Sequence, residues 1–99
     1  MANTSTILRI EHKVDNFDFW KRMFDNDPIG RQKSDVRRYR IMRPTDDPNY
    51  VMIDLEFDGA KEAENFRSAL LNLWGTLEEQ KIMQNPQLRI VELLETKTY

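Results

Sequence analysis

The chain has 99 residues, a formal net charge of −2 at pH 7 and no cysteine. The length fits one domain, and the lack of cysteine excludes disulfides, thiolate metal sites and a cysteine nucleophile. The slightly acidic charge argues against nucleic acid as the main partner, because phosphate binding needs a basic field. No apolar run approaches the roughly 20 residues of a membrane helix, and residues 1–6 lack the basic and apolar regions of a signal peptide. We therefore expect a cytoplasmic protein without a membrane partner.

The first predicted element is a strand over Thr6–Val14. Apolar residues alternate along it with charged ones, which is the period-two pattern of a strand with one deeply buried face. The apolar face holds Leu8, Ile10 and His12. The pattern therefore places the single histidine of the chain on the buried side of the sheet.

A helix is predicted over Asn16–Asp25, where Phe17, Trp20 and Phe24 recur at positions i, i+3 and i+7. This spacing is typical of a helix that packs one face against a sheet. Asp15 is the predicted N-cap, because its carboxylate can accept hydrogen bonds from the free amides of the first turn.

Two further strands are predicted over Val36–Arg43 and Tyr50–Phe57, joined by a short loop that contains Pro44 and Pro48. The first of these strands is very basic, with arginine at positions 37, 38, 40 and 43. The second alternates clearly between an apolar and a more polar face. A longer helix begins near Gly59, with an apolar stripe at helical spacing.

The last predicted strand covers Leu88–Glu95, after Asn85-Pro86 as a stop signal for the preceding segment. The element order is therefore β-α-β-β-α-β, which is the α+β ferredoxin-like arrangement with both helices on one face of an antiparallel sheet. We assign residues 1–99 to a single domain, in which residues 1–5 are expected to be disordered and residues 96–99 to form a tail.

The sheet face opposite the helices mixes opposite charges with apolar side chains. Arg9 and Asp54 are a candidate ion pair there, beside Ile7, Tyr50 and Met52. A domain of this size buries only roughly 60–65% of its unfolded surface, so a homodimer in which two such faces meet would add useful burial. The alternative is a solvated open face, which antiparallel sheets tolerate.

Four stretches of the sequence carry a family resemblance. They are residues 9–14, residues 15–25, Tyr39-Arg40 followed by residues 46–51, and residues 55–58 with Ala63 and Phe66. Together they resemble the small dimeric α/β-barrel proteins, specifically a bacterial branch labelled cyclase-like or antibiotic-biosynthesis-monooxygenase-like. The resemblance spans residues 7–70. It implies a homodimer whose two sheets form a barrel, and a pocket between each sheet and its helices.

Members of this family include cofactor-independent oxygenases, haem-degrading enzymes and isomerases. The haem-degrading members use a histidine on the second helix as the iron ligand, and the predicted second helix here has no histidine. Trp74 is similar to their pocket tryptophan, but without the ligand we do not expect haem degradation.

His12 is the candidate catalytic residue, because a histidine near a strand end suits a general base or a polar anchor for a ligand. The alternative is a histidine at the edge of the core, satisfied by a backbone carbonyl or by water. The candidate ligand-binding residues are aromatic, as small-molecule sites usually are, and the alternative for them is a packed core or cross-strand packing. They are Trp20, Phe24, Tyr39, Phe66 and Trp74.

One histidine with scattered acids offers no known metal-ligand spacing, and the chain has no glycine-rich phosphate loop. We therefore expect neither a metal nor a cofactor. The arginines of residues 37–43 suit a carboxylate or phosphate ligand or ion pairs with Glu11, Asp54 and Glu56. The third strand lacks the basic-glycine-aromatic pattern of RNA-recognition sheets.

Two functions stay open from the sequence. The first is a small-molecule-binding protein, or a cofactor-independent monooxygenase-like or cyclase-like enzyme, that acts on an apolar or aromatic substrate. The resemblance implies that such a substrate would itself supply electrons to oxygen. The second is a non-catalytic dimeric binding or regulatory module with a closed pocket and a structural His12. The sequence does not decide whether the protein is an enzyme.

Overall fold

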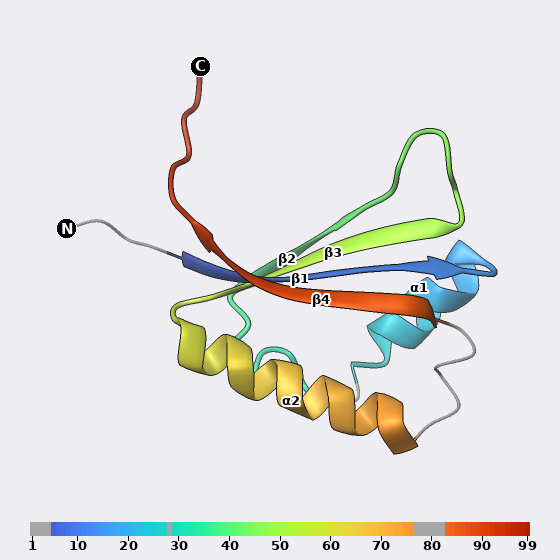
Figure 1. The fold of residues 1–99 in the computed structure, drawn as a ribbon, viewed down its shortest axis with the longest axis horizontal. Coiled ribbons are helices and arrows are strands. Elements are labelled where there is room, and N and C mark those ends of the chain that lie inside the picture. Colours follow the sequence, from blue (N-terminus) through green and yellow to red (C-terminus); the bar gives the residue numbers. More distant parts are fainter. Residues whose placement is uncertain (1–4, 28, 77–82) are drawn as a thin grey trace.

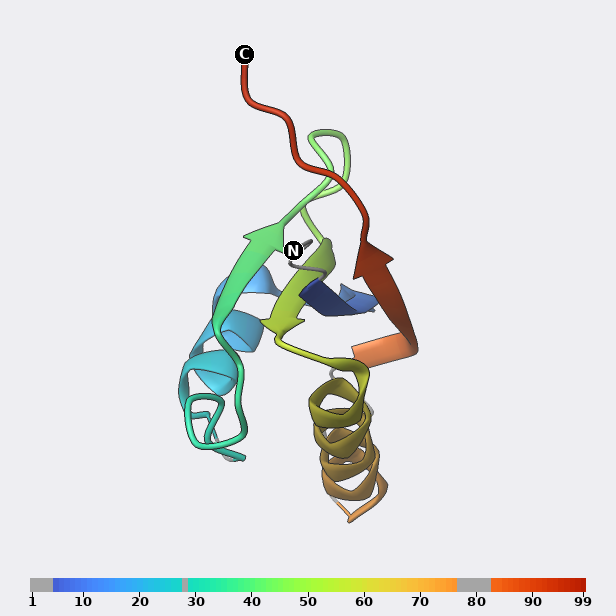
Figure 2. The same cartoon turned by 90° about the vertical axis from the view of Figure 1, so that its left-hand side faces the viewer.

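The computed structural model describes residues 5–27, 29–76 and 83–99, and it arranges them as one sheet with two helices beneath it (Figure 1). The elements are β1 (Ser5–Val14), α1 (Phe17–Asp25), β2 (Arg38–Met42), β3 (Tyr50–Phe57), α2 (Ala60–Thr76) and β4 (Met83–Leu93). Both helices lie on the same side of the sheet, and β2 and β4 form its edges (Figure 2). The predicted β-α-β-β-α-β order and the α+β ferredoxin-like fold are confirmed.

The sheet has the strand order β2-β3-β1-β4, and every neighbouring pair is antiparallel. In the central pair, Leu8 lies opposite Leu55 and Ile10 lies opposite Ile53. Because directly opposed residues share a face, this register puts the apolar positions of both strands on the side of the helices. The alternation seen in the sequence thus produces one apolar face.

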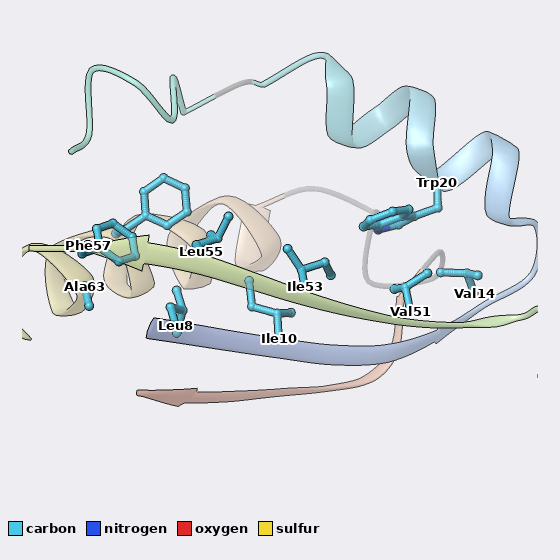
Figure 3. Close-up of a cluster of buried hydrophobic side chains, with 10 residues drawn as sticks. Leu8, Ile10, Val14, Trp20, Val51, Ile53, Leu55, Phe57 and Ala63 are labelled. Carbon is cyan, nitrogen blue, oxygen red and sulfur yellow. The ribbon is translucent and has the colours of Figure 1, made fainter. Parts of the chain in front are cut away.

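The core fills the space between this apolar face and the helices (Figure 3). Trp20 comes from α1, whereas Ala63 and Phe66 come from α2. Each fully buried large apolar side chain stabilises the fold by roughly 1.5–3 kcal/mol relative to its exposed state. The buried positions of the sheet are Leu8, Ile10, Val14, Val51, Ile53, Leu55 and Phe57.

Strand β2 is shorter than predicted at both ends. Before it, Asp35 has a φ of 73° and the amide of Val36 donates to the carbonyl of Arg31. This left-handed residue and the turn it closes keep Val36 out of the ladder, although the amide of Arg37 already donates to the carbonyl of Glu56. The strand therefore begins only at Arg38.

Strand β4 begins at Met83, five residues before the predicted Leu88, and it includes Pro86. Along β1, Glu11 pairs with Gln87 but Lys13 pairs with Gln84, so the register shifts where Pro86 lies. Proline has no amide hydrogen for a ladder and is tolerated at edge strands and bulges. Asn85-Pro86 therefore marks a bulge within a strand, and its interpretation as a stop signal was wrong.

The N-cap of α1 is Asn16, not the predicted Asp15. The side-chain Oδ1 of Asn16 accepts a hydrogen bond of 2.9 Å from the amide of Phe19, and the backbone of Asn16 is extended. Aspartate and asparagine are about equally good N-caps. Two adjacent candidates therefore cannot be separated without the backbone geometry.

Candidate functional site

His12 lies at the helix-facing side of β1 and is only 2% exposed. Its ring and the Trp20 ring are steeply inclined to one another, at 64°, with 5.9 Å between the two centroids. Trp20 reaches this position because it is in the first turn of α1, which begins three residues after β1 ends. The indole points from the helix toward the sheet in Figure 3. The short connection thus places the imidazole and the indole against one another.

A row of aromatic rings continues from Trp20 to the surface. The centroid of Trp20 lies 5.3 Å from that of Phe24, and the centroid of Phe24 lies 5.0 Å from that of Tyr39. Tyr39, on the edge strand β2, is 43% exposed. We call His12, Trp20, Phe24 and Tyr39 the aromatic row. It joins a buried imidazole to an exposed phenol.

Two arginines cover the flanks of the aromatic row. The guanidinium of Arg31 lies 3.9 Å from the centroid of Phe24, and that of Arg43 lies 4.8 Å from the centroid of Phe17. Arg31 also donates to the carbonyl oxygen of Phe24 at 2.9 Å. A guanidinium over an aromatic face is attracted by the ring quadrupole, so Arg31 holds the loop after α1 against Phe24.

An open depression of about 510 Å³ lies at the exposed end of the aromatic row. Its wall includes Tyr39 of the aromatic row and Arg31, whose guanidinium lies over Phe24. The remaining lining residues are Asp27, Gln32, Val36, Arg37 and Arg38.

The other candidate wall residues do not join this row in the described part of the structure. Phe66 packs against Phe57, with 5.7 Å between centroids, and Phe57 lies at the opposite end of the core from Trp20 in Figure 3. The backbone of position 74 belongs to α2, but the side chain of Trp74 lies outside the described residues. The structure therefore brings together His12, Trp20, Phe24 and Tyr39, and it places Phe66 elsewhere.

The hydrogen bond of the imidazole defines which of its nitrogens is available. The Nδ1 atom lies 3.0 Å from the carbonyl oxygen of Lys13. A carbonyl oxygen only accepts, so Nδ1 carries the hydrogen and Nε2 carries the lone pair in the neutral ring. Burial lowers the pKa of His12, and the hydrogen bond to Lys13 opposes this in part. The side chain is therefore held as a neutral imidazole with a basic Nε2.

This lowered pKa predicts a pH dependence of stability. Because the folded protein binds a proton at His12 less readily than the unfolded chain, whose histidine pKa is about 6.5, the contribution of His12 is complete above that pH and is lost as the pH falls below it. We expect wild type to lose up to about 1.4 kcal/mol more than His12→Gln between pH 7.5 and pH 5.5, measured by urea unfolding. An identical loss in both proteins would contradict this assignment.

Four residues contribute to the site in ways that the sequence did not predict. Arg31 and Arg43 contact aromatic rings. The sequence pattern indicated only a basic strand for Arg43 and gave no signal for Arg31. Phe17, predicted as part of the helix stripe, lies 5.7 Å from Trp20 between their centroids and widens the row. The group that selects the tautomer of His12 is the backbone carbonyl of Lys13. Every residue has such a carbonyl, so the sequence cannot predict this contact.

Within residues 5–27, 29–76 and 83–99, no group of three or more histidine, cysteine or acidic side chains is placed to hold a metal ion. In the same residues, no helix has the length and apolar character needed to cross a membrane.

Comparison with known proteins gives structural likeness without sequence likeness. No protein-family model matches the sequence, and no curated protein matches it. A protein of unknown function from Nitrosomonas europaea has a similar structure, with a TM-score of 0.66 and 14% identity over 98% of this chain and 96% of the other. A proposed antibiotic biosynthesis monooxygenase from the same organism is similar with a TM-score of 0.64 and 14% identity, over 95% of this chain and 94% of the other.

At 14% identity these likenesses show the fold. The resemblance inferred from the sequence, to the antibiotic-biosynthesis-monooxygenase-like branch of the ferredoxin-like proteins, is confirmed at that level. The chain therefore shares its α+β fold with these two proteins.

Proposed function

We propose that this protein binds a small apolar or aromatic molecule along the aromatic row, with Nε2 of His12 as the polar group that meets it. The observation that carries the proposal is the hydrogen bond between Nδ1 of His12 and the carbonyl oxygen of Lys13. It leaves the lone pair of Nε2 as the only basic atom of a buried ring that lies against Trp20. Apolar walls with a single well-defined polar group are usual in small-molecule sites.

In this proposal the reaction is cofactor-independent and monooxygenase-like or cyclase-like. His12 accepts a proton from an acidic hydroxyl or carbon of the substrate, which is the role of a general base. The substrate anion, rather than a bound cofactor, then supplies electrons to oxygen. The structural likeness to a proposed antibiotic biosynthesis monooxygenase supports this direction.

We also propose that two copies pair through the open sheet faces to form a barrel. The open face is partly shielded from solvent, since Ile7 and Asp54 are both buried on it. A second sheet on this face would cover Met52 and Val91 as well, which are half-buried in one copy. Native mass spectrometry of the purified protein tests this pairing directly and also reveals any small molecule that it retains.

The site is tested with two probes, 1-naphthol and naphthalene, followed by quenching of tryptophan fluorescence. We expect 1-naphthol to bind about fivefold more tightly, because its hydroxyl donates to Nε2 of His12 and one such hydrogen bond contributes roughly 1 kcal/mol. His12→Phe retains a ring but removes Nε2, so the two probes should bind it equally. Phe24→Leu is the matched control, which should weaken both probes and keep their ratio.

A closed dimeric module is the second candidate function, and one observation favours it. His12 and Trp20 are both almost fully buried and their rings are in contact, so the inner end of the row is well packed. If neither probe binds wild-type protein and the native mass spectrum shows no added mass, the module is supported and the enzyme proposal is wrong.

A further inference from the structure

A row of four charged residues crosses the open face of the sheet, one from each strand. Arg40 on β2 lies opposite Asp54 on β3, Asp54 lies opposite Arg9 on β1, and Arg9 lies opposite Arg89 on β4. Directly opposed residues of antiparallel strands project from the same face. We call these four residues the arginine row. Three arginines and one aspartate give it a charge of +2, in a chain whose net charge is −2.

Asp54 is committed to one of the three arginines. Its two carboxylate oxygens accept from Nε and Nη2 of Arg9, both at 2.8 Å, and its side chain is almost completely buried. This pair leaves Nη1 of Arg9 with its hydrogens. Arg40 and Arg89 are exposed, and neither has an acidic partner in the portion of the chain that the structure describes. Among the described residues, one of the three arginines of the row therefore has an ion-pair partner.

The neighbouring acids on the same face are also engaged. Glu56 pairs with Arg38 at 3.5 Å and accepts from the hydroxyl of Ser5 at 3.1 Å. Glu11 accepts from the hydroxyl of Tyr50 at 2.9 Å. Glu56 is thus paired with Arg38, whereas Glu11 keeps its negative charge. The hydrogen bond and charge of Asp54, and to a smaller extent the charge of Glu11, raise the pKa of Arg9.

Arg9 and Arg89 are like charges directly opposite one another, an arrangement that destabilises a strand pair. On the next row of the same face, the neighbours of these two arginines are Ile7 and Val91, which also lie opposite one another. Both arginines are exposed, so an anion from solvent can reach their guanidinium groups. An anion bound between these two arginines would relieve their repulsion.

We propose that Arg9 and Arg89 form a binding site for an oxyanion, the phosphate or carboxylate group of a small molecule, with Arg40 adding positive potential. Arginine forks match the geometry of both groups and bond them with two donors. The site is separate from the aromatic row, which lies on the other face of the sheet. If two copies pair through their open faces, bound anions would also reduce the repulsion between the two arginine rows.

The test is a titration with sodium phosphate at pH 7, followed by ¹H–¹⁵N correlation NMR that includes the Nε–H signal of Arg9. Sodium chloride at matched ionic strength is the reference. We expect saturable shifts at Arg9 and Arg89 with phosphate only, affinity at least tenfold lower in Arg89→Gln, and a smaller loss in Arg40→Gln. Arg22→Gln, which removes an exposed arginine of α1, should bind phosphate as wild type does.

Citrate and acetate distinguish the two anion sources. Saturable binding of citrate, but not of phosphate, at the same residues would assign a carboxylate site. Without any anion, Arg89→Gln should be at least as stable as wild type, because the like-charge contact is removed, and thermal unfolding measures this. Equal shifts with chloride, or unchanged phosphate and citrate affinity in Arg89→Gln, would overturn the proposal.

Discussion

Replacement of Phe57 by alanine is expected to lower the free energy of unfolding by about 4 kcal/mol. The side chain is fully buried at the end of β3 and packs against Phe66 of α2. Its removal loses the transfer free energy of the ring and leaves a cavity between the sheet and the helix. Natural domains have total stabilities of about 5–15 kcal/mol, so a large share of the stability would be lost. Urea unfolding followed by circular dichroism measures the effect.

Phe19→Ala is the matched control for this prediction. Phe19 is the same residue type, but it lies on the outer side of α1 and is 45% exposed. We expect its replacement to cost less than about 1 kcal/mol, as is usual for surface positions. Similar losses in the two variants would mean that Phe57 is not part of a closely packed core.

The central strands could be predicted from the sequence because one physical rule determines them. In β1 and β3 one face is buried and the other is polar, so the side chains alternate with period two. The predicted bounds of β3 are exact, and those of β1 differ by one residue. The edge strands have less burial to impose a pattern. The bounds of β2 and β4 were accordingly the least accurate, since a positive-φ residue and a bulge decide them.

The aromatic row could be predicted in part because two of its members lie close to one sheet end. His12 is near the end of β1, and Trp20 is in the first turn of the helix that follows. Phe66 is early in α2, which follows β3, and β3 ends where β1 begins. With a rise of about 3.3 Å per residue, the two ends of this strand pair are about 20 Å apart. A helical stripe shows which face is buried but not its position along the sheet.

The two faces of the sheet use charge differently. On the helix-facing side, the guanidinium group of Arg31 lies over the ring of Phe24, and that of Arg43 lies over the ring of Phe17. On the open side, Arg9 and Arg38 pair with acids of β3. The arginines of residues 37–43 looked like a single basic cluster in the sequence. Strand β2 places these arginines on different faces of the sheet, so they contact different partners.

Replacement of Asp54 by alanine is expected to lower the free energy of unfolding by about 2–3 kcal/mol. The carboxylate is buried and accepts two hydrogen bonds from Arg9, and loss of one partner leaves the other charge uncompensated. Arg9 keeps access to water, so we expect less than the full cost of a buried unpaired charge. Three arginines would then lie in one row, and their repulsion adds to the loss. Urea unfolding at low ionic strength measures this change in the free energy of unfolding.

Asp58→Ala is the matched control for Asp54→Ala. Asp58 also pairs with an arginine, Arg37, but both side chains are mostly exposed, and an exposed pair contributes about 0–1 kcal/mol. The loss in Asp54→Ala should shrink in 1 M sodium chloride, where the Debye length is about 3 Å and the remaining arginines repel one another less. If Asp54→Ala costs no more than Asp58→Ala at low salt, the buried pair does not stabilise the sheet. In that case the arginine row would lie on the surface without a stabilising ion pair between Arg9 and Asp54.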